Sequence, residues 1–189
     1  QLGGELLASI ENTVLAANET AGSGGAVLSS MDNPGIIETS LNNTILYGNS
    51  ALSGGGIYRE DGAALVTYCD AWDNAPDDYA NMTDPTGTDG NSAVDPLFVD
   101  VAPADPLDWN LHLALASPLI DAGDPAQFDP DGSTSDMGAY GGSRASTWDL
   151  DHDGYDAWWQ PGEYDHGLYP GQDLDCDDLD ETVYPGNGC

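Results

Sequence analysis

Two stretches decide the fold: residues 12–18 read NTVLAAN, and residues 43–49 read NTILYGN. Each is followed by a glycine-rich segment, AGSGGAVL at 21–28 and ALSGGGIY at 51–58, and a looser third copy, LVTYCDAWDN, occupies 65–74. Short β-favouring runs such as Val-Leu, Thr-Ile-Leu and Gly-Ile-Tyr alternate with Gly, Asn, Ser and Asp. A period near 30 residues with this punctuation indicates a repeat of short strands and turns.

The repeat predicts an all-β protein built as a parallel β-solenoid. One turn of such a chain buries too little apolar surface by itself, whereas stacked turns share one continuous core. The alternative is a β-sandwich in which the same residues form ordinary surface turns. The solenoid is favoured because the copies match residue by residue.

Two features of the repeat have a structural role in this prediction. Asn18, Asn49 and Asn74 follow three strands at equivalent places, so their stacked side chains are expected to hydrogen-bond as a ladder. The paired glycines, Gly24-Gly25 and Gly54-Gly55, permit turn conformations that other residues avoid.

The end of the chain has a different chemistry. Residues 149–155 read DLDHDGY and residues 173–186 read DLDCDDLDETVYPG. Alternate carboxylates followed by Gly154 resemble the opening of a calcium loop, in which a hard cation collects six to eight oxygens. Asp149, Asp151 and Asp153 are the candidate side-chain ligands, with the carbonyl of Tyr155. Position 12 of the loop is Gln160 rather than an acid, so the closing carboxylates are expected from the second cluster.

Composition extends this acidity to the whole chain. There are 34 acidic residues against two arginines and no lysine, which gives a formal net charge of -32. Such a surface does not bind nucleic acid or an anionic membrane, and no apolar run is long enough to span a bilayer. Two explanations remain, namely bound divalent cations or a solvated surface adapted to high salt. The Asp spacing favours cations in the tail, and the solvated surface is favoured elsewhere.

The most specific further segments are VDPLFVD (94–100), WNLHLALASPLIDAGDP (109–125) and DPDGSTSDMGAYGG (129–142). With the repeats, they resemble right-handed parallel β-helix repeat proteins of bacterial and archaeal cell surfaces. The resemblance implies that these segments form the closing end of the helix. Within DPDGSTSD, Asp129, Asp131 and Asp136 are interpreted as a capped turn rather than a cation site.

The tail resembles the Asp-rich metal-binding repeats of MopE type and, more distantly, thrombospondin type 3 and dockerin calcium loops. This resemblance pairs the two acidic clusters around one or two Ca²⁺ ions. It implies that the second cluster contributes Asp173, Asp175, Asp177 and Asp178. A disulfide between Cys176 and Cys189 is expected in an oxidising compartment, whereas Cys69 is predicted to be a small core residue.

Catalysis has little support in the sequence. A β-elimination lyase needs a base such as Lys or Arg, and the two arginines, Arg59 and Arg144, lie far apart in the chain. A carboxylate pair for hydrolysis can always be picked from so many acids, so such a pair has no diagnostic value. We therefore predict that the chain is not an enzyme.

The sequence thus predicts two parts. Residues 1–144 form a short right-handed parallel β-helix with its closing segment, and residues 145–189 form a small loop-rich calcium-binding module. The predicted function is that of a secreted or cell-surface structural protein, with head-to-tail self-association into a filament as its expected partner interaction. The alternative is a polysaccharide-binding or polysaccharide-degrading β-helix fragment.

Overall fold

A computed structural model describes residues 5–30, 36–114, 116–129 and 132–143 of the chain. This part is all-β, and its one helical element is a single 3₁₀ turn, η1 (Pro106–Asp108). Within these residues, no helix has the length and apolar character needed to cross a membrane. The all-β class predicted from the sequence is confirmed.

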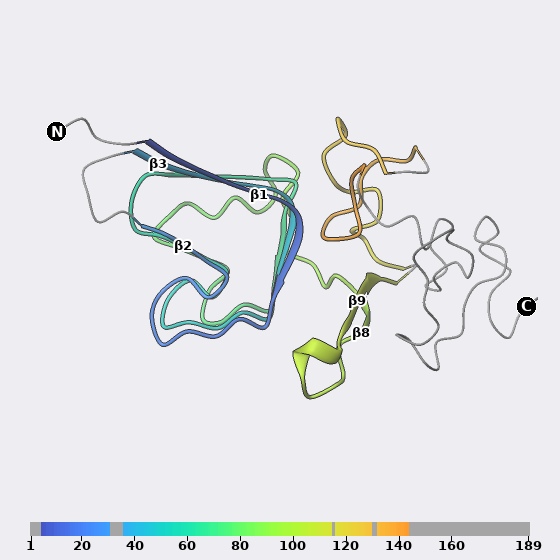
Figure 1. Cartoon of the computed structure of the whole chain (residues 1–189), viewed down its shortest axis with the longest axis horizontal. Coiled ribbons are helices and arrows are strands. Elements are labelled where there is room, and N and C mark those ends of the chain that lie inside the picture. Colours follow the sequence, from blue (N-terminus) through green and yellow to red (C-terminus); the bar gives the residue numbers. More distant parts are fainter. Residues whose placement is uncertain (1–4, 31–35, 115, 130–131, 144–189) are drawn as a thin grey trace, which may run out of the picture.

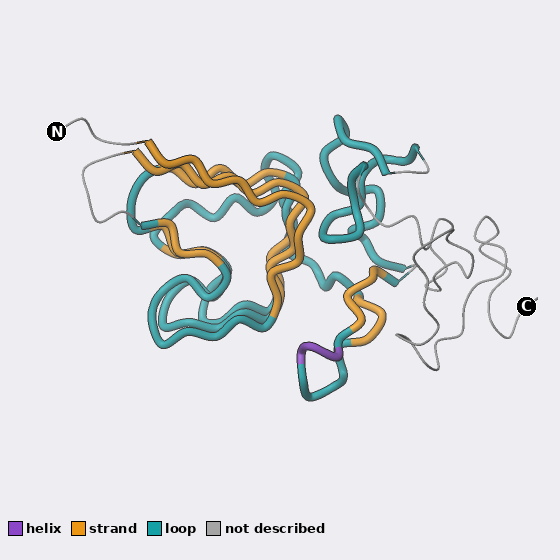
Figure 2. Tube along the Cα trace, viewed as in Figure 1, coloured by secondary structure: helices purple, strands orange, loops and turns teal. Residues whose placement is uncertain are grey.

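Two parallel sheets face each other across the N-terminal part of the molecule (Figures 1 and 2). In the larger sheet β3 (Ile36–Tyr47) is central: β1 (Glu5–Ala16) pairs with one side, and β5 (Ala63–Thr67) and β6 (Asp70–Trp72) pair with the other. The smaller sheet has the order β2 (Val27–Ser29), β4 (Ile57–Arg59) and β7 (Tyr79–Ala80). An antiparallel pair follows, formed by β8 (Phe98–Asp100) and β9 (Asn110–Leu113).

The strand pairing reproduces the sequence repeat. Thr13 pairs with Thr44 and Ala16 with Tyr47, so NTVLAAN lies directly beside NTILYGN. The glycine-rich copies are aligned in the same way, with Val27 beside Ile57. The chain therefore follows one path three times, over residues 5–29, 36–59 and 63–80, which we call the three windings (Figure 2).

Each long strand bends at an asparagine. Asn12 and Asn43 have φ values of 46° and 49°, a left-handed conformation that asparagine tolerates better than most residues. The next residue fixes the bend, because the Thr13 hydroxyl donates to the Glu11 carbonyl at 2.8 Å and Thr44 does the same to Asn42 at 3.0 Å. β1 and β3 are consequently 12-residue bent strands, longer than the short runs that the sequence suggests.

The paired glycines behave as predicted. Gly24 and Gly54 have φ values of 72° and 62°. Gly25 and Gly55 serve a different purpose, since a Cβ atom on Gly25 would lie 2.2 Å from the Gly55 carbonyl oxygen. Only glycine allows the windings to approach this closely.

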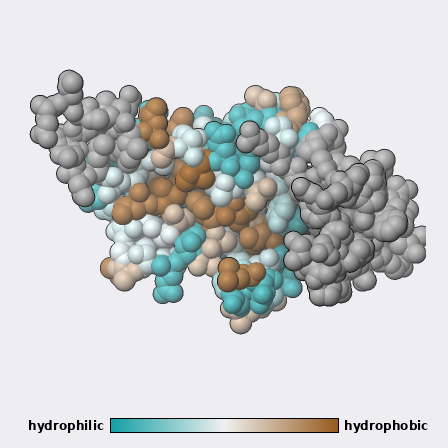
Figure 3. Space-filling model, viewed as in Figure 1, coloured by the Kyte–Doolittle hydropathy of each residue, from teal (hydrophilic) through white to brown (hydrophobic). Residues whose placement is uncertain are grey.

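The interior is built from columns of apolar side chains, one residue from each winding. The second and third windings supply Leu41 and Val66, Leu46 and Ala71, and Ile57 and Tyr79, all of them buried. Their counterparts in the first winding are only partly buried: Ile10, Leu15 and Val27. Figure 3 shows apolar surface gathered over the interior of the windings. The first winding thus leaves one end of the core open in the described structure.

A second core covers the outer face of the large sheet. Ile45, with Val14 beside it, packs against Leu113, Leu119 and Met137 from the later part of the chain. Figure 1 shows this later part, through residue 143, beside the wall formed by the second halves of β1 and β3. The resemblance implies that residues 94–100, 109–125 and 129–142 close the end of the helix; among the described residues, Leu113, Leu119 and Met137 from these segments pack against the side of the large sheet.

Candidate functional site

The predicted calcium ligands lie outside the described residues, as does the predicted disulfide between Cys176 and Cys189. The ligands concerned are Asp149, Asp151, Asp153, Tyr155, Asp173, Asp175, Asp177 and Asp178. Among the residues that the structure does describe, no three His, Cys, Asp or Glu side chains are grouped to hold a metal ion.

The asparagine ladder forms as predicted. Asn18 donates through its Nδ2 atom to Oδ1 of Asn49 at 2.8 Å, and Asn49 donates in the same way to Asn74 at 2.8 Å. Oδ1 of Asn49 also accepts the backbone N–H of Asn18, and Oδ1 of Asn74 accepts the backbone N–H of Asn49, both at 3.0 Å. Asn74 then donates to Asp78 Oδ1 at 2.7 Å. Asn49 is fully buried, so the ladder satisfies polar groups that water cannot reach.

In the described residues of DPDGSTSD, Asp129 and Asp136 cap backbone N–H groups, which agrees with the capped turn interpreted from the sequence. The buried Asp129 carboxylate accepts the backbone N–H groups of Asp136 and Gly142. The Asp136 carboxylate accepts the N–H of Asp121 at 2.7 Å. Asp131 lies outside the described residues. These two carboxylates thus fix the loops that cover the outer face of the sheet.

His112 and Cys69 are also structural. The ring of His112 stacks on that of Tyr140, with their centroids 3.7 Å apart, and its Nδ1 lies 2.7 Å from Asn110 Oδ1. Cys69 is fully buried, as predicted, and burial raises the pKa of its thiol to about 12. Such a thiol is protonated at neutral pH and is inert.

A buried carboxylate joins the windings to the later part of the chain. Asp70 is fully buried, and its Oδ1 accepts the Ser92 hydroxyl at 2.6 Å and the Val94 N–H at 3.0 Å. Its Oδ2 atom has no hydrogen-bond partner. Burial, with a smaller contribution from Asp78 and Asp95, raises the pKa of this carboxyl to about 6 despite the two hydrogen bonds.

A cluster of amides forms a second junction, at the bend of the long strands. Oε1 of Gln127 accepts from Nδ2 of Asn12 at 3.3 Å and from Nδ2 of Asn43 at 3.4 Å. Nε2 of Gln127 donates to Asn42 Oδ1 at 2.8 Å. Asn43 Oδ1 accepts the Asp124 N–H at 2.6 Å. One glutamine thereby ties two windings to the segment that covers them.

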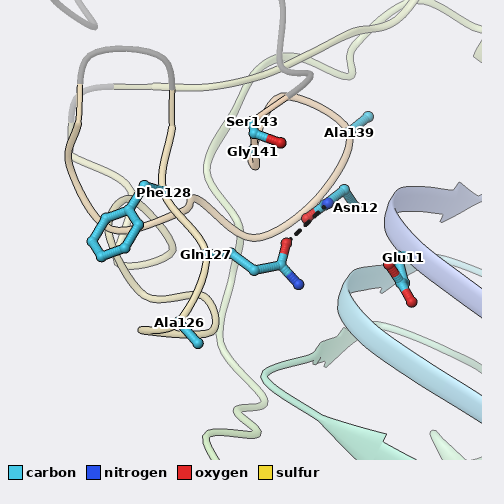
Figure 4. Close-up of a pocket in the computed structure, with 8 residues that line it drawn as sticks. All are labelled: Glu11, Asn12, Ala126, Gln127, Phe128, Ala139, Gly141 and Ser143. Atoms are coloured by element: carbon cyan, nitrogen blue, oxygen red, sulfur yellow. Dashed lines mark hydrogen bonds between the residues drawn. The ribbon is translucent and has the colours of Figure 1, made fainter.

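Beside this amide cluster lies a pocket of about 690 Å³. Its lining comes from the bend of β1 and from two stretches of the later segment, 126–128 and 139–143: Glu11, Asn12, Ala126, Gln127, Phe128, Ala139, Gly141 and Ser143. Figure 4 shows Phe128 on the opposite side of the hollow from Glu11 and Asn12, with Gln127 between them. The Phe128 side chain is 54% exposed although it is large and apolar.

Sequence reasoning did not identify this pocket. The one available signal was the repeated Asn-Thr pair at the start of both copies, since Asn12 and Asn43 occupy the bends from which the amide cluster is built. Gln127 and Phe128 carried no signal, because their position depends on how a distant loop folds back onto the sheet.

No known protein family, no curated protein and no solved structure matches the chain.

Proposed function

We propose that this protein is an extracellular, calcium-binding structural protein of the cell surface, built on a short right-handed parallel β-helix. The observation that carries the proposal is the residue-by-residue stacking of three windings along both sheets. The chain uses its repeats to hold the windings in register through backbone pairs, glycine contacts and the buried asparagine ladder. This is the organisation of repeat proteins, in which each unit binds its neighbours.

Calcium enters the proposal through the two Asp-rich segments that follow the described residues. Asp149, Asp151 and Asp153, with the Tyr155 carbonyl, provide the first set of oxygens. Asp173, Asp175, Asp177 and Asp178 provide the second. The support is chemical: residues 145–189 contain 12 acidic residues and no basic residue, so their mutual repulsion is strong unless cations neutralise it. One or two ions bound there would couple calcium binding to folding.

In this role the protein acts through assembly and not through catalysis. The partly buried residues of the first winding support head-to-tail association, because a second molecule can complete the columns that they begin. Calcium would reduce the repulsion between two such acidic surfaces.

Calcium titration by isothermal calorimetry tests the calcium-binding role directly. The full chain should bind one or two Ca²⁺ ions, and Asp151→Ala and Asp153→Ala should each remove or strongly weaken binding. The matched control is Asp108→Ala, because Asp108 is exposed and lies outside both acidic segments. If the chain binds no calcium, or if the control weakens binding as much as the tail substitutions do, the proposal is wrong.

A further inference from the structure

The pocket beside the amide cluster has the chemistry of a ligand site that the structural role does not use. We propose that it binds a neutral sugar unit of a polysaccharide or glycan. This proposal goes beyond the calcium-dependent structural function and does not rest on it. The volume of about 690 Å³ lies within the range of small-molecule sites in proteins, which combine an apolar wall with a few convergent polar groups.

The apolar wall is the ring of Phe128. An exposed aromatic ring at the edge of a hollow offers a flat face on which the C–H face of a sugar ring can lie. Phe128 is 54% exposed and is not part of the second core, in which Leu113 and Met137 are buried. The described core therefore does not use this ring.

The polar wall provides both donors and acceptors. Nδ2 of Asn12 and Nε2 of Gln127 each make one hydrogen bond within the amide cluster, so each has a second hydrogen to donate. Glu11 offers carboxylate oxygens, of which Oε1 accepts the Ser9 hydroxyl at 2.9 Å, and Ser143 offers a hydroxyl. Sugar hydroxyls both donate and accept, so they match this mixed set.

Charge decides between a neutral ligand and its alternatives. Among the described residues, the lining contains one carboxylate and no cation, and the chain carries a net charge of -32, so the proposal predicts that phosphates, sulfates and uronates are repelled. An ammonium ligand would use Glu11 and the Phe128 ring. It has no acceptor, however, for the amide hydrogens of Asn12 and Gln127. A neutral, hydroxyl-rich ring can use the carboxylate of Glu11, the amides of Asn12 and Gln127 and the ring of Phe128 together.

The amide cluster also gives the site rigidity. Gln127 is held by three hydrogen bonds to residues of β1 and β3, so the pocket's polar wall is fixed before a ligand arrives. A fixed wall reduces the entropy lost on binding.

The test uses the full chain, labelled with ¹⁵N, and two neutral probes, maltohexaose and cellohexaose. The contrasting probes are the galacturonate hexamer, which is anionic, and the glucosamine hexamer, which is cationic. At least one neutral probe should shift the amide signals of Glu11, Asn12, Gln127 and Phe128. Phe128→Ala should weaken its affinity about fivefold or more. Leu107→Ala is the control, because Leu107 is 91% exposed and does not line the pocket.

Three results would overturn the proposal. The first is that neither neutral hexasaccharide binds. The second is that a neutral probe binds Phe128→Ala as well as it binds the wild type, which would place the probe at another site. The third is that the cationic hexamer binds more tightly than both neutral probes and loses its affinity in Glu11→Gln, which would make the pocket an amine site.

Discussion

At the scale of single residues, Asp70 is a buried carboxyl whose desolvation destabilises its ionised form. It occupies the same column as Val14 and Ile45 on the outer face of the sheet, where an apolar residue would be expected. It holds Ser92 and Val94 in place, but its second oxygen is buried without a partner. Ionisation therefore carries a desolvation penalty that two hydrogen bonds only partly offset.

The first prediction follows from the raised pKa of the Asp70 carboxyl. The folded-state pKa of Asp70 is about 6, above the ordinary 3.8, so the folded protein binds this proton more tightly than the unfolded chain. The resulting stabilisation is present below the unfolded value and is lost as pH rises through about 6. Asp70→Asn should remove it. Between pH 4 and 7.5, the free energy of unfolding of wild type minus that of the variant should fall by roughly 2–3 kcal/mol. Urea unfolding measures both proteins, and a pH-independent difference would contradict the prediction.

The second prediction concerns Asn49 in the ladder. Asn49→Ala leaves the Asn18 N–H and amide without their acceptor and the Asn74 oxygen without one of its donors. The expected loss of stability is about 2–4 kcal/mol, since buried polar groups lose their partners. Asn18→Ala is the graded control, because it removes only the outermost, exposed side chain and should cost about 1 kcal/mol. Urea unfolding measures both variants. Equal losses of stability would show that the buried hydrogen bonds of Asn49 stabilise the fold no more than the exposed side chain of Asn18 does.

At the scale of elements, the repeat predicts the register of the paired strands. It does not predict which later segment packs against the outer face of the sheet. Matching residues in the copies are enough to align them, because parallel neighbours at equivalent positions satisfy the backbone and the core together. The alignment holds although the offset shortens from 31 residues between Thr13 and Thr44 to 25 between Leu41 and Val66. The bends at Asn12 and Asn43 were not foreseen, since they depend on single left-handed residues. The expected ladder and glycine turns needed only local rules, and both were found.

The sequence contains one indication that the outer face of the large sheet is covered, and the structure explains it. Val14-Leu15 and Ile45-Leu46 are consecutive apolar pairs, and neighbouring residues of a strand point to opposite faces. Both faces of the sheet therefore needed a cover, and the outer one is supplied by residues around Leu113, Leu119 and Met137. Which later segment supplies it depends on contacts too distant in sequence for a local pattern to reveal. The pocket escaped prediction for the same reason.

The third prediction compares two glycines of the second winding. A Cβ on Gly55 would lie 2.4 Å from the Ala75 carbonyl oxygen of the next winding, so Gly55→Ala should separate the stacked backbones and cost about 3 kcal/mol. Gly48 has a φ of 62° but open space around it, and its counterpart in the first winding is Ala17 at 53°. Gly48→Ala should cost only about 1 kcal/mol. Thermal and urea unfolding measure the stability of both variants. A Gly55→Ala protein as stable as Gly48→Ala would refute the close-packing argument.

At the scale of the whole molecule, the core end that the described residues leave open and the high negative charge have opposite effects on association. The first winding leaves Ile10, Leu15 and Val27 partly buried, and this favours contact with another apolar surface. The charge of -32 opposes such contact unless cations screen it.

The fourth prediction is therefore that association depends on calcium. The mass in solution should rise with protein concentration in millimolar-scale calcium and return to that of a monomer in EDTA. Leu15→Glu should suppress association by charging the open end, whereas Leu107→Glu, at a residue 91% exposed and far along the chain, should not. Light scattering gives the mass, and circular dichroism checks that both variants fold. A chain that stays monomeric at high concentration in calcium contradicts the filament.

We propose that calcium binding to the Asp-rich segments orders residues 145–189, while the windings fold by their own stacking. Hydrogen exchange read by mass spectrometry, in calcium and in excess EDTA, tests it most directly. Chelation should abolish protection in peptides from residues 145–189, whereas peptides from 36–80 should keep theirs, and Asp151→Ala should reproduce this pattern in calcium. Identical exchange of residues 145–189 with and without calcium would contradict it.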